Sequence, residues 1–211
     1  MDIDDQLIDS LGITPPACVA LVGAGGKTTL MLAMHAEAVR RGWEVTAATT
    51  TKVAACEVAG IDGFVHGGRV GDKLTGASFD TIAAISSGLV VVEADGARSK
   101  AAKAPDAHEP MVPPTATHVV AVVGADALDR VIAEVAHRPM LVAAVCGCRP
   151  DSRLTATRAA SLLTSDGGGR KGVPLGAEFA VAITRIGPRQ RQAADALAAL
   201  LDESGVRTVL V

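Results

Sequence analysis

The sequence predicts an α/β protein, a three-layer α/β/α sandwich built on a mostly parallel sheet. Short apolar runs without polar alternation, typical of strands buried on both faces, alternate with longer segments rich in Ala and Leu. Such alternation is typical of right-handed strand–helix–strand crossovers. The length of 211 residues fits one domain, and the apolar share of 49% with only 2% aromatic residues predicts an aliphatic core.

Six strands and five helices are expected in chain order. The strands are the apolar runs at residues 18–22, 45–48, 89–92, 119–123, 179–183 and 206–211. The helices are expected at residues 28–41, 80–87, 126–136, 154–164 and 189–203. Gly42 marks the end of the first helix, and the last helix lies between Pro188 and Gly205, both typical of helix boundaries.

We expect one domain over residues 1–211, with a small helical excursion at about residues 138–174. Residues 99–117 contain four of the ten prolines and predict a long irregular loop. Residues 167–172 are rich in glycine and predict a turn or linker.

The charge balance argues against two classes of partner. The chain has 20 Lys and Arg against 23 Asp and Glu, a formal charge of −3, so no broad nucleic-acid surface is expected. No run of about 18 apolar residues occurs, so no membrane-spanning helix is expected. Residues 1–5 are acidic where a secretion signal would be basic, and we expect a cytoplasmic protein.

A glycine-rich loop follows the first predicted strand and opens the first predicted helix. Its glycines allow backbone N–H groups to approach phosphate oxygens, and the helix N-terminus adds a positive dipole end. The lysine is expected to reach the terminal phosphates, and Thr28 to hold Mg²⁺. The predicted nucleotide-binding residues of this loop are Gly23, Ala24, Gly25, Gly26, Lys27, Thr28 and Thr29. A glycine turn without function is the alternative.

The loop is shorter than the common phosphate-binding motif. The pattern G-x-x-x-x-G-K-[ST] would need glycine where Leu21 stands, and the sequence instead has G-x-x-G-K-T-T. This shorter form resembles the ATP loop of the Mur ligases and folylpolyglutamate synthetases. A dinucleotide fingerprint is disfavoured, because Thr28 stands where its third glycine belongs.

Two carboxylates follow the third predicted strand. Glu93 and Asp95 lie two residues apart, so an extended strand places both on one side. We expect Asp95 to hold Mg²⁺ together with Thr28, and Glu93 to orient a water molecule. Lys27 would stabilise charge on the transferred phosphoryl group, which makes these two carboxylates and Lys27 the predicted catalytic residues. A solvated strand end followed by an Asp-Gly turn is the alternative.

Further candidates lie on loops at the same predicted sheet edge. Thr51 and Lys52 end the second strand, where they would contact phosphate or its magnesium, although threonine is also common in ordinary strands. Lys103 and Glu109 lie on the proline-rich loop, which would fold over the phosphates. Charges that face water are the alternative there.

Taken in order, these blocks resemble one family. V-G-A-G-G-K-T-T, T-T-T-K, V-E-A-D-G-A, K-A-P-x-x-x-E-P-x-x-P and G-x-D-A are similar to YqeC-type proteins, which are described as accessory proteins of selenium-dependent molybdenum hydroxylases. The resemblance covers essentially the whole chain and is strongest over residues 22–139. It implies a fold like that of P-loop NTPases, nucleotide binding, and a role in the maturation of a selenium or molybdenum cofactor.

The resemblance leaves the base of the nucleotide open. Near the fifth strand the family tends to have an Asn-Lys segment similar to the guanine-reading element of GTPases, and this chain has neither residue at 182–188. Thr184 and Arg185 would line the base pocket by position only.

The predicted function is therefore an accessory protein that binds and hydrolyses ATP or GTP with Mg²⁺, as a nucleoside triphosphatase. Its expected partners are a nucleoside triphosphate and a molybdenum hydroxylase or cofactor-maturation protein. Two alternatives stay open: an ATP-dependent ligase or transferase acting on a small substrate, and a nucleotide-binding scaffold without turnover.

Overall fold

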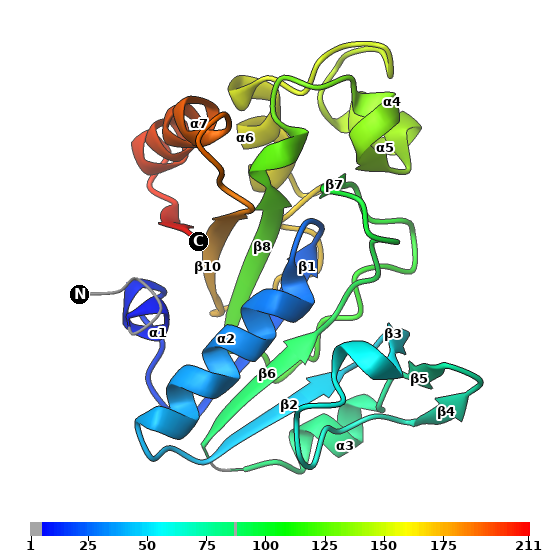
Figure 1. Cartoon of the computed structure of the whole chain (residues 1–211), viewed down its shortest axis with the longest axis vertical. Helices are drawn as coiled ribbons and strands as arrows, with labels where there is room; N and C mark the ends of the chain where they lie inside the picture. The colour runs from blue at the N-terminus through cyan, green and yellow to red at the C-terminus, as the bar shows by residue number, and fades with distance from the viewer. Residues whose placement is uncertain (1–5, 87) are drawn as a thin grey trace.

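The computed structural model is an α/β structure organised around one parallel sheet of six strands (Figure 1). It describes residues 6–86 and 88–211. The acidic residues 1–5 and Ser87, the predicted end of one helix, lie outside the described residues. The strand order is β11-β10-β8-β1-β6-β2. The strands are β1 (Ala17–Gly23), β2 (Val45–Thr49), β6 (Leu89–Glu93), β8 (His118–Gly124), β10 (Glu178–Thr184) and β11 (Arg207–Leu210).

All six predicted strands are confirmed, with each end displaced by at most one residue. The reason is burial on both faces. Val19 and Leu21 of β1 pack with Met31 and Met34, whereas Ala20 of the same strand belongs to a second cluster on the opposite face. Runs without polar alternation are therefore what this sheet requires.

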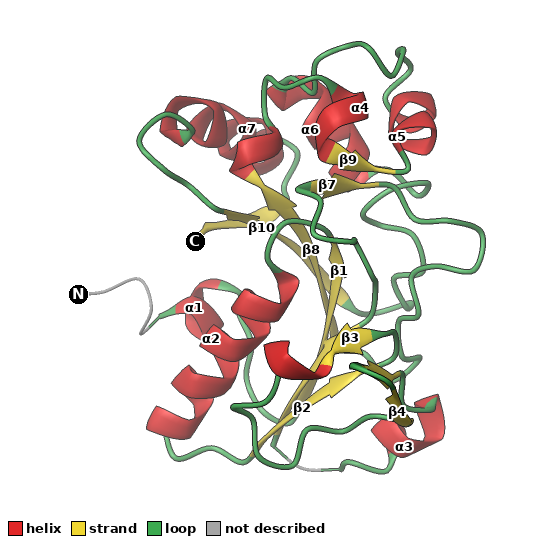
Figure 2. Cartoon of the chain, turned by 45° about the vertical axis from the view of Figure 1, so that its right-hand side comes forward, coloured by secondary structure: helices red, strands yellow, loops and turns green. Residues whose placement is uncertain are grey.

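Helices cover both faces of the sheet. The clusters place α1 (Leu7–Ser10) and α2 (Lys27–Arg40) on one face, and α3 (Phe79–Ala83), α6 (Ala156–Thr164) and α7 (Arg191–Glu203) on the other. Figure 2 shows α2 and α3 on opposite sides of the sheet. The predicted three-layer arrangement is thus confirmed. Within the described ranges, no helix is long and apolar enough to cross a membrane.

The predicted helix at residues 126–136 is wrong. The structure has a 3₁₀ turn, η3 (Ala125–Ala127), and a short helix, α4 (Ile132–Val135), with left-handed Asp129 (φ 58°) between them. Backbone bonds to another segment replace the helical ones: the N–H of Asp129 donates to Leu154 O (2.9 Å) and that of Ile132 to Ser152 O (3.0 Å).

Several small elements were not predicted. A three-stranded antiparallel sheet consists of β3 (Val53–Ala54), β5 (Lys73–Thr75) and β4 (Gly68–Val70), and a 3₁₀ turn, η2 (Ala55–Glu57), follows β3. In the predicted proline-rich loop, β7 (Ala102–Lys103) pairs with β9 (Ala136–His137). Helix α5 (Pro139–Val145) and α6 lie in the segment of the expected helical excursion, and the division into domains stays a prediction.

The topology of the sheet indicates where a ligand would bind. From β1 the chain crosses by α2 to β2 on one side, whereas from β8 it continues to β10 on the other. The carboxyl ends of β1 and β8 therefore flank a topological switch point, the usual binding crevice of open parallel sheets. The glycine-rich loop follows β1 at this point.

Candidate functional site

The glycine-rich loop is clamped against β8. Ala24 N–H donates to Val122 O (2.9 Å). A Cβ atom at Gly25 would lie 2.2 Å from the backbone nitrogen of Gly124, and one at Gly23 would lie 2.4 Å from Val122 O. Gly25 also has a φ of 94°, a conformation that side chains disfavour. Glycine is therefore required here by both space and backbone geometry.

The loop presents a row of unpartnered donors. Gly26 caps α2 without a side-chain hydrogen bond, and the first helical bond runs from Leu30 N–H to Gly26 O (2.9 Å). Among the residues that the structure describes, no hydrogen bond is found for the five backbone N–H groups from Gly25 to Thr29. Consecutive free N–H groups at the start of a helix favour an anion, because the dipole adds positive charge there.

Lys27, Thr28 and Glu93 meet beside this row of donors. Lys27 Nζ donates to Gly23 O (2.8 Å) and lies 3.9 Å from Glu93 Oε1. Thr28 Oγ1 donates to Glu93 Oε2 (2.7 Å). Burial lowers the pKa of Lys27 and raises the pKa of Glu93, and the attraction between the two groups opposes both shifts. The strand pairing explains the contact, since Glu93 at the end of β6 is in register with Leu21 of β1.

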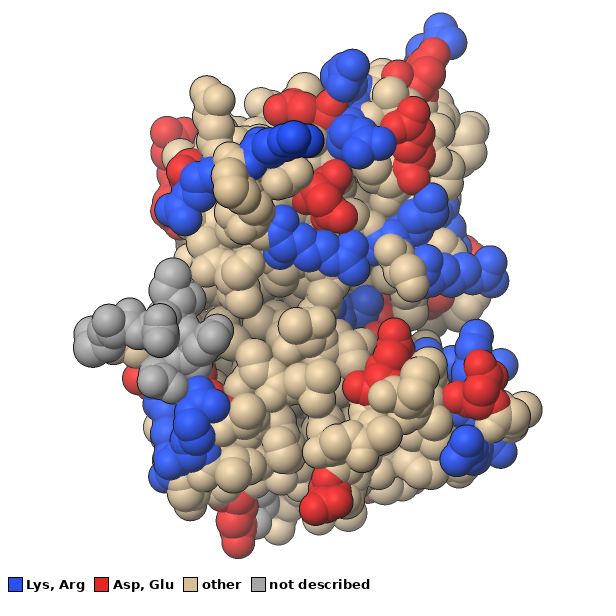
Figure 3. All heavy atoms as spheres, viewed as in Figure 1, with Lys and Arg blue, Asp and Glu red and all other residues tan. Residues whose placement is uncertain are grey.

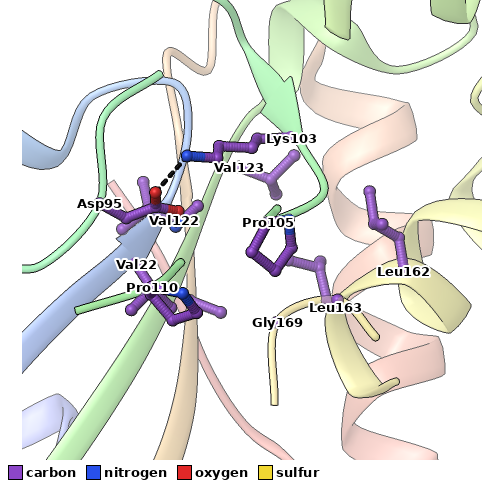
Figure 4. Close-up of a pocket in the computed structure, with 13 residues that line it drawn as sticks. Val22, Asp95, Lys103, Pro105, Pro110, Val122, Val123, Leu162, Leu163 and Gly169 are labelled. Atoms are coloured by element: carbon purple, nitrogen blue, oxygen red, sulfur yellow. Dashed lines mark hydrogen bonds and ion pairs between the residues drawn. The ribbon is translucent and has the colours of Figure 1, made fainter. Parts of the chain in front are cut away.

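Asp95 makes different contacts. Its Oδ2 accepts the Gly23 N–H (3.2 Å), and its Oδ1 accepts a hydrogen bond from Lys103 Nζ (Figure 4). Burial raises the pKa of Asp95, although the Lys103 ammonium opposes the shift. Both predicted carboxylates thus face the loop, but Thr28 touches Glu93 and not Asp95. These contacts favour Glu93 over Asp95 as the partner of Thr28 at a metal.

Lys103 begins a buried chain of charges. Its side chain is 0% exposed, and its Nζ contacts Gly96 O and lies 2.6 Å from Glu109 Oε2. Glu109 in turn accepts from Arg138 Nη1 (2.5 Å) and Nη2 (3.2 Å). Burial alone would raise the pKa of Glu109, but the hydrogen bonds from Arg138 and Lys103 outweigh it and lower the pKa to about 2.

Arg138 is the site residue that the sequence reasoning did not select. It has left-handed geometry (φ 59°) directly after β9, whose His137 pairs with Lys103 across the small parallel sheet. The available signal was the run His137-Arg138-Pro139, which resembles a block of the family.

The second predicted strand end is only partly brought to the site. Thr51 Oγ1 would lie 3.6 Å from a Cβ atom at Gly96, so this hydroxyl is close to the turn after Asp95. Lys52 is exposed, and no contact joins its ammonium to the other site residues within the described chain. Thr184, expected by position, is buried, and its hydroxyl donates to Gly25 O and to Val123 O (3.3 Å).

Basic side chains lie near this edge of the sheet. Figure 3 shows Lys and Arg side chains gathered in a band near the carboxyl ends of β1 and β8. Arg98, Arg138 and Arg185 follow β6, β9 and β10, and all three have positive φ. Among the described residues, there is no cluster of three or more His, Cys, Asp or Glu side chains that could hold a metal ion by themselves.

The fold and this loop define the class: an α/β protein with a glycine-rich loop at the switch point of a parallel sheet. The chain matches the family model described as YqeC protein over residues 19–67 and 63–140, and it belongs to the YqeC family. It is 30% identical over 186 residues to a protein of Escherichia coli (strain K12) named Uncharacterized protein YqeC, covering 76% of this chain and 73% of that protein. No solved structure matches the chain.

Proposed function

We propose that this protein binds a magnesium nucleoside triphosphate at the loop of residues 23–29 and hydrolyses it slowly. The observation that carries the proposal is the row of five N–H groups from Gly25 to Thr29 that have no partner among the described residues, with Lys27 and the Thr28–Glu93 pair beside it. The basic band near the same sheet edge supports a polyanionic ligand (Figure 3).

In the proposed complex, the Lys27 ammonium exchanges its present acceptor, Gly23 O, for a phosphate oxygen. The side chain of Lys27 is 4% exposed, its ammonium donates to Gly23 O, and burial lowers its pKa. A phosphate in the row of N–H groups would supply the negative charge that a buried ammonium requires. In this role Lys27 stabilises charge on the β- and γ-phosphates, where phosphoryl transfer needs it most.

The residues beside Lys27 fit Mg²⁺. This ion binds proteins through one or two oxygen ligands and keeps phosphate and water oxygens in the rest of its octahedron. The Thr28 hydroxyl and the Glu93 carboxylate, already 2.7 Å apart, supply such oxygens. When bound, the ion would neutralise phosphate charge. We accordingly exchange the two expected roles: Glu93 acts with Thr28 at the metal, and Asp95, on Gly23, orients the attacking water.

The wider role follows from the family resemblance. We propose that the protein acts in the cytoplasm as an accessory to a selenium-dependent molybdenum hydroxylase, with that enzyme or a cofactor-maturation protein as partner. The proposal rests on that resemblance, and the comparisons add only that the chain belongs to the YqeC family. Slow hydrolysis by few residues is consistent with an activity that a partner accelerates.

A small pocket beside the site bears on the transferase alternative. The pocket lies beside Asp95 and Lys103 (Figure 4), and about 20 Å³ of it is open to the centre of a water-sized sphere. Its remaining lining is mostly apolar and includes Pro105, Pro110 and Leu163. Its size suits water next to the Asp95 carboxylate, and a larger acceptor molecule would need the lining to open.

Calorimetric titration with ATP, GTP and their diphosphates in the presence of Mg²⁺ tests the proposal. Lys27→Ala should abolish triphosphate affinity, whereas Lys73→Ala, which removes an exposed lysine from β5, should leave it unchanged. Phosphate release with and without small carboxylate, hydroxyl or selenium acceptors separates hydrolysis from transfer. Equal affinity in wild type and Lys27→Ala would contradict the proposed site.

A further inference from the structure

Asp126 and Arg185 form an ion pair on the far wall of the switch point. Asp126 follows β8 and Arg185 follows β10, the two strands beside β1 on the side away from β2. Arg185 Nη1 lies 3.3 Å from Asp126 Oδ2. A nucleotide with its phosphates on the loop after β1 would extend its base either toward β6 or toward this pair, and Asp95 and Lys103 already fill the β6 side with charge.

The pair is tied directly to the phosphate loop. The residue before Arg185, Thr184, donates its hydroxyl to Gly25 O. Gly124, two residues before Asp126, packs closely on Gly25. A Cβ atom at Gly25 would lie 2.2 Å from the backbone nitrogen of Gly124. The backbone that carries the pair is therefore held against the loop with the row of free N–H groups.

Both members have unused hydrogen-bonding capacity. Asp126 Oδ2 accepts one hydrogen bond among the described residues, from Arg185, and can accept another from a ligand, whereas Oδ1 is buried without a partner and would be reached only if the side chain turned. Arg185 has one contact in the described structure, the one to Asp126, of its five donors. Arg185 is also left-handed (φ 56°), a strained geometry for arginine that is common at binding sites. The two side chains are 41% and 44% exposed, so a ligand can reach them.

We propose that Asp126 and Arg185 are the base-recognition pair and that they select guanine over adenine. This inference rests on the proposed function. On guanine, the O6 acceptor lies beside the N1–H and N2–H donors, so a guanidinium next to a carboxylate matches both groups. Adenine presents the reverse at these positions, an N6–H donor beside an N1 acceptor, so each side chain would face a group of its own kind.

The test is calorimetric titration of the full chain with GTP, ITP, XTP and ATP in Mg²⁺. Wild type should bind GTP roughly 10- to 100-fold more tightly than ATP, in keeping with the discrimination of bidentate contacts. ITP, which lacks the N2 amino group, should fall between them, and XTP, which has an oxygen there, should bind weakly.

Asp126→Asn makes the test specific. Its amide N–H matches the additional oxygen of xanthine, so affinity should move from GTP toward XTP by about tenfold or more. Asp129→Asn, which removes an exposed carboxylate three residues away, should change neither. Melting temperatures of both variants check folding.

Equal affinity for the four nucleotides, tighter binding of ATP, or an unchanged GTP-to-XTP ratio in Asp126→Asn would overturn the assignment of the base while leaving the proposed function intact. If no triphosphate binds, the proposed function itself fails, and this inference with it.

Discussion

The Thr28 hydroxyl donates to the Glu93 carboxylate across 2.7 Å, which joins the start of α2 to the end of β6. Glu93 is buried, so this bond and the nearby Lys27 ammonium provide its stabilisation. A carboxylate held in this way changes its contacts when phosphate and Mg²⁺ arrive, because both compete for the same groups. The first two predictions follow from this contact.

Thr28→Val should remove the magnesium dependence of nucleotide affinity. Valine has the shape of threonine but no oxygen, so Glu93 loses a partner and a metal loses a ligand. We expect the ratio of Kd values without and with Mg²⁺ to fall toward one, and stability to fall by about 1–2 kcal/mol. Thr28→Ser keeps the hydroxyl and should keep both properties. Calorimetry and urea unfolding measure them.

Glu93→Gln and Asp95→Asn should have different effects. Glu93→Gln weakens Mg²⁺-dependent binding by about tenfold or more, because a ligand carboxylate is lost. Asp95→Asn should retain nucleotide affinity, since Asp95 contacts Gly23 and not Thr28. It should lower the rate of phosphate release, because Asp95 is the residue proposed to orient the attacking water. Titration and single-turnover assays separate the two effects. If Asp95→Asn instead weakens Mg²⁺-dependent binding and Glu93→Gln lowers only the rate, Asp95 is the metal ligand.

Lys103→Met should strongly destabilise the protein. The substitution leaves Asp95 and Glu109 without the ammonium that both contact, and breaking a buried ion pair in this way typically costs about 3–5 kcal/mol. Lys73→Met, on the exposed face of β5, should stay within about 0.5 kcal/mol of wild type. Urea denaturation compares the two. A small loss at Lys103 would show that water already reaches its contacts.

Glu109 should make stability depend on pH in the acid range. Its folded pKa of about 2 is below the ordinary value of 4.5, so its stabilising contribution is present above pH 4.5 and is lost as the pH falls toward 2. The stability difference between wild type and Glu109→Gln should therefore shrink over that window. Denaturant unfolding at pH 6, 4 and 2.5 measures it. A constant difference would mean that Arg138 and Lys103 do not stabilise the charged form.

Gly25→Ala should lower the free energy of unfolding by more than its left-handed backbone alone explains. Gly25 and Gly71 both have positive φ, but a Cβ atom at Gly71 meets no atom of the described residues within 4 Å. We expect Gly71→Ala to cost about 1–2 kcal/mol. Gly25→Ala adds the clash with Gly124 and should also abolish triphosphate binding. Thermal unfolding and titration provide both readouts, and equal costs would show that β8 can move away.

The strands were predictable because burial on both faces leaves apolar runs such as residues 89–92. The segment at 126–136 was not, because its helix-forming residues are bonded instead to residues 150–154, a long-range contact that local pattern does not encode. Local spacing similarly placed Glu93 and Asp95 on one side of a strand, but it did not show which one Thr28 contacts. The run His137-Arg138-Pro139 did not show that Arg138 reaches Glu109, because its position depends on the pairing of β7 and β9, two strands too short to be predicted from local pattern.

The close packing of Gly25 on Gly124 has a consequence for reading other chains of this architecture. The obstruction at Gly25 is peptide backbone, so no substitution at position 124 would make room for a side chain. A related chain that kept this sheet but did not bind nucleotide would still need glycine at the position of Gly25. Glycine at position 25 is therefore evidence only for the close packing of the loop on β8. Lys27 and Thr28 are not required by packing, so their presence is better evidence for the proposed nucleotide binding.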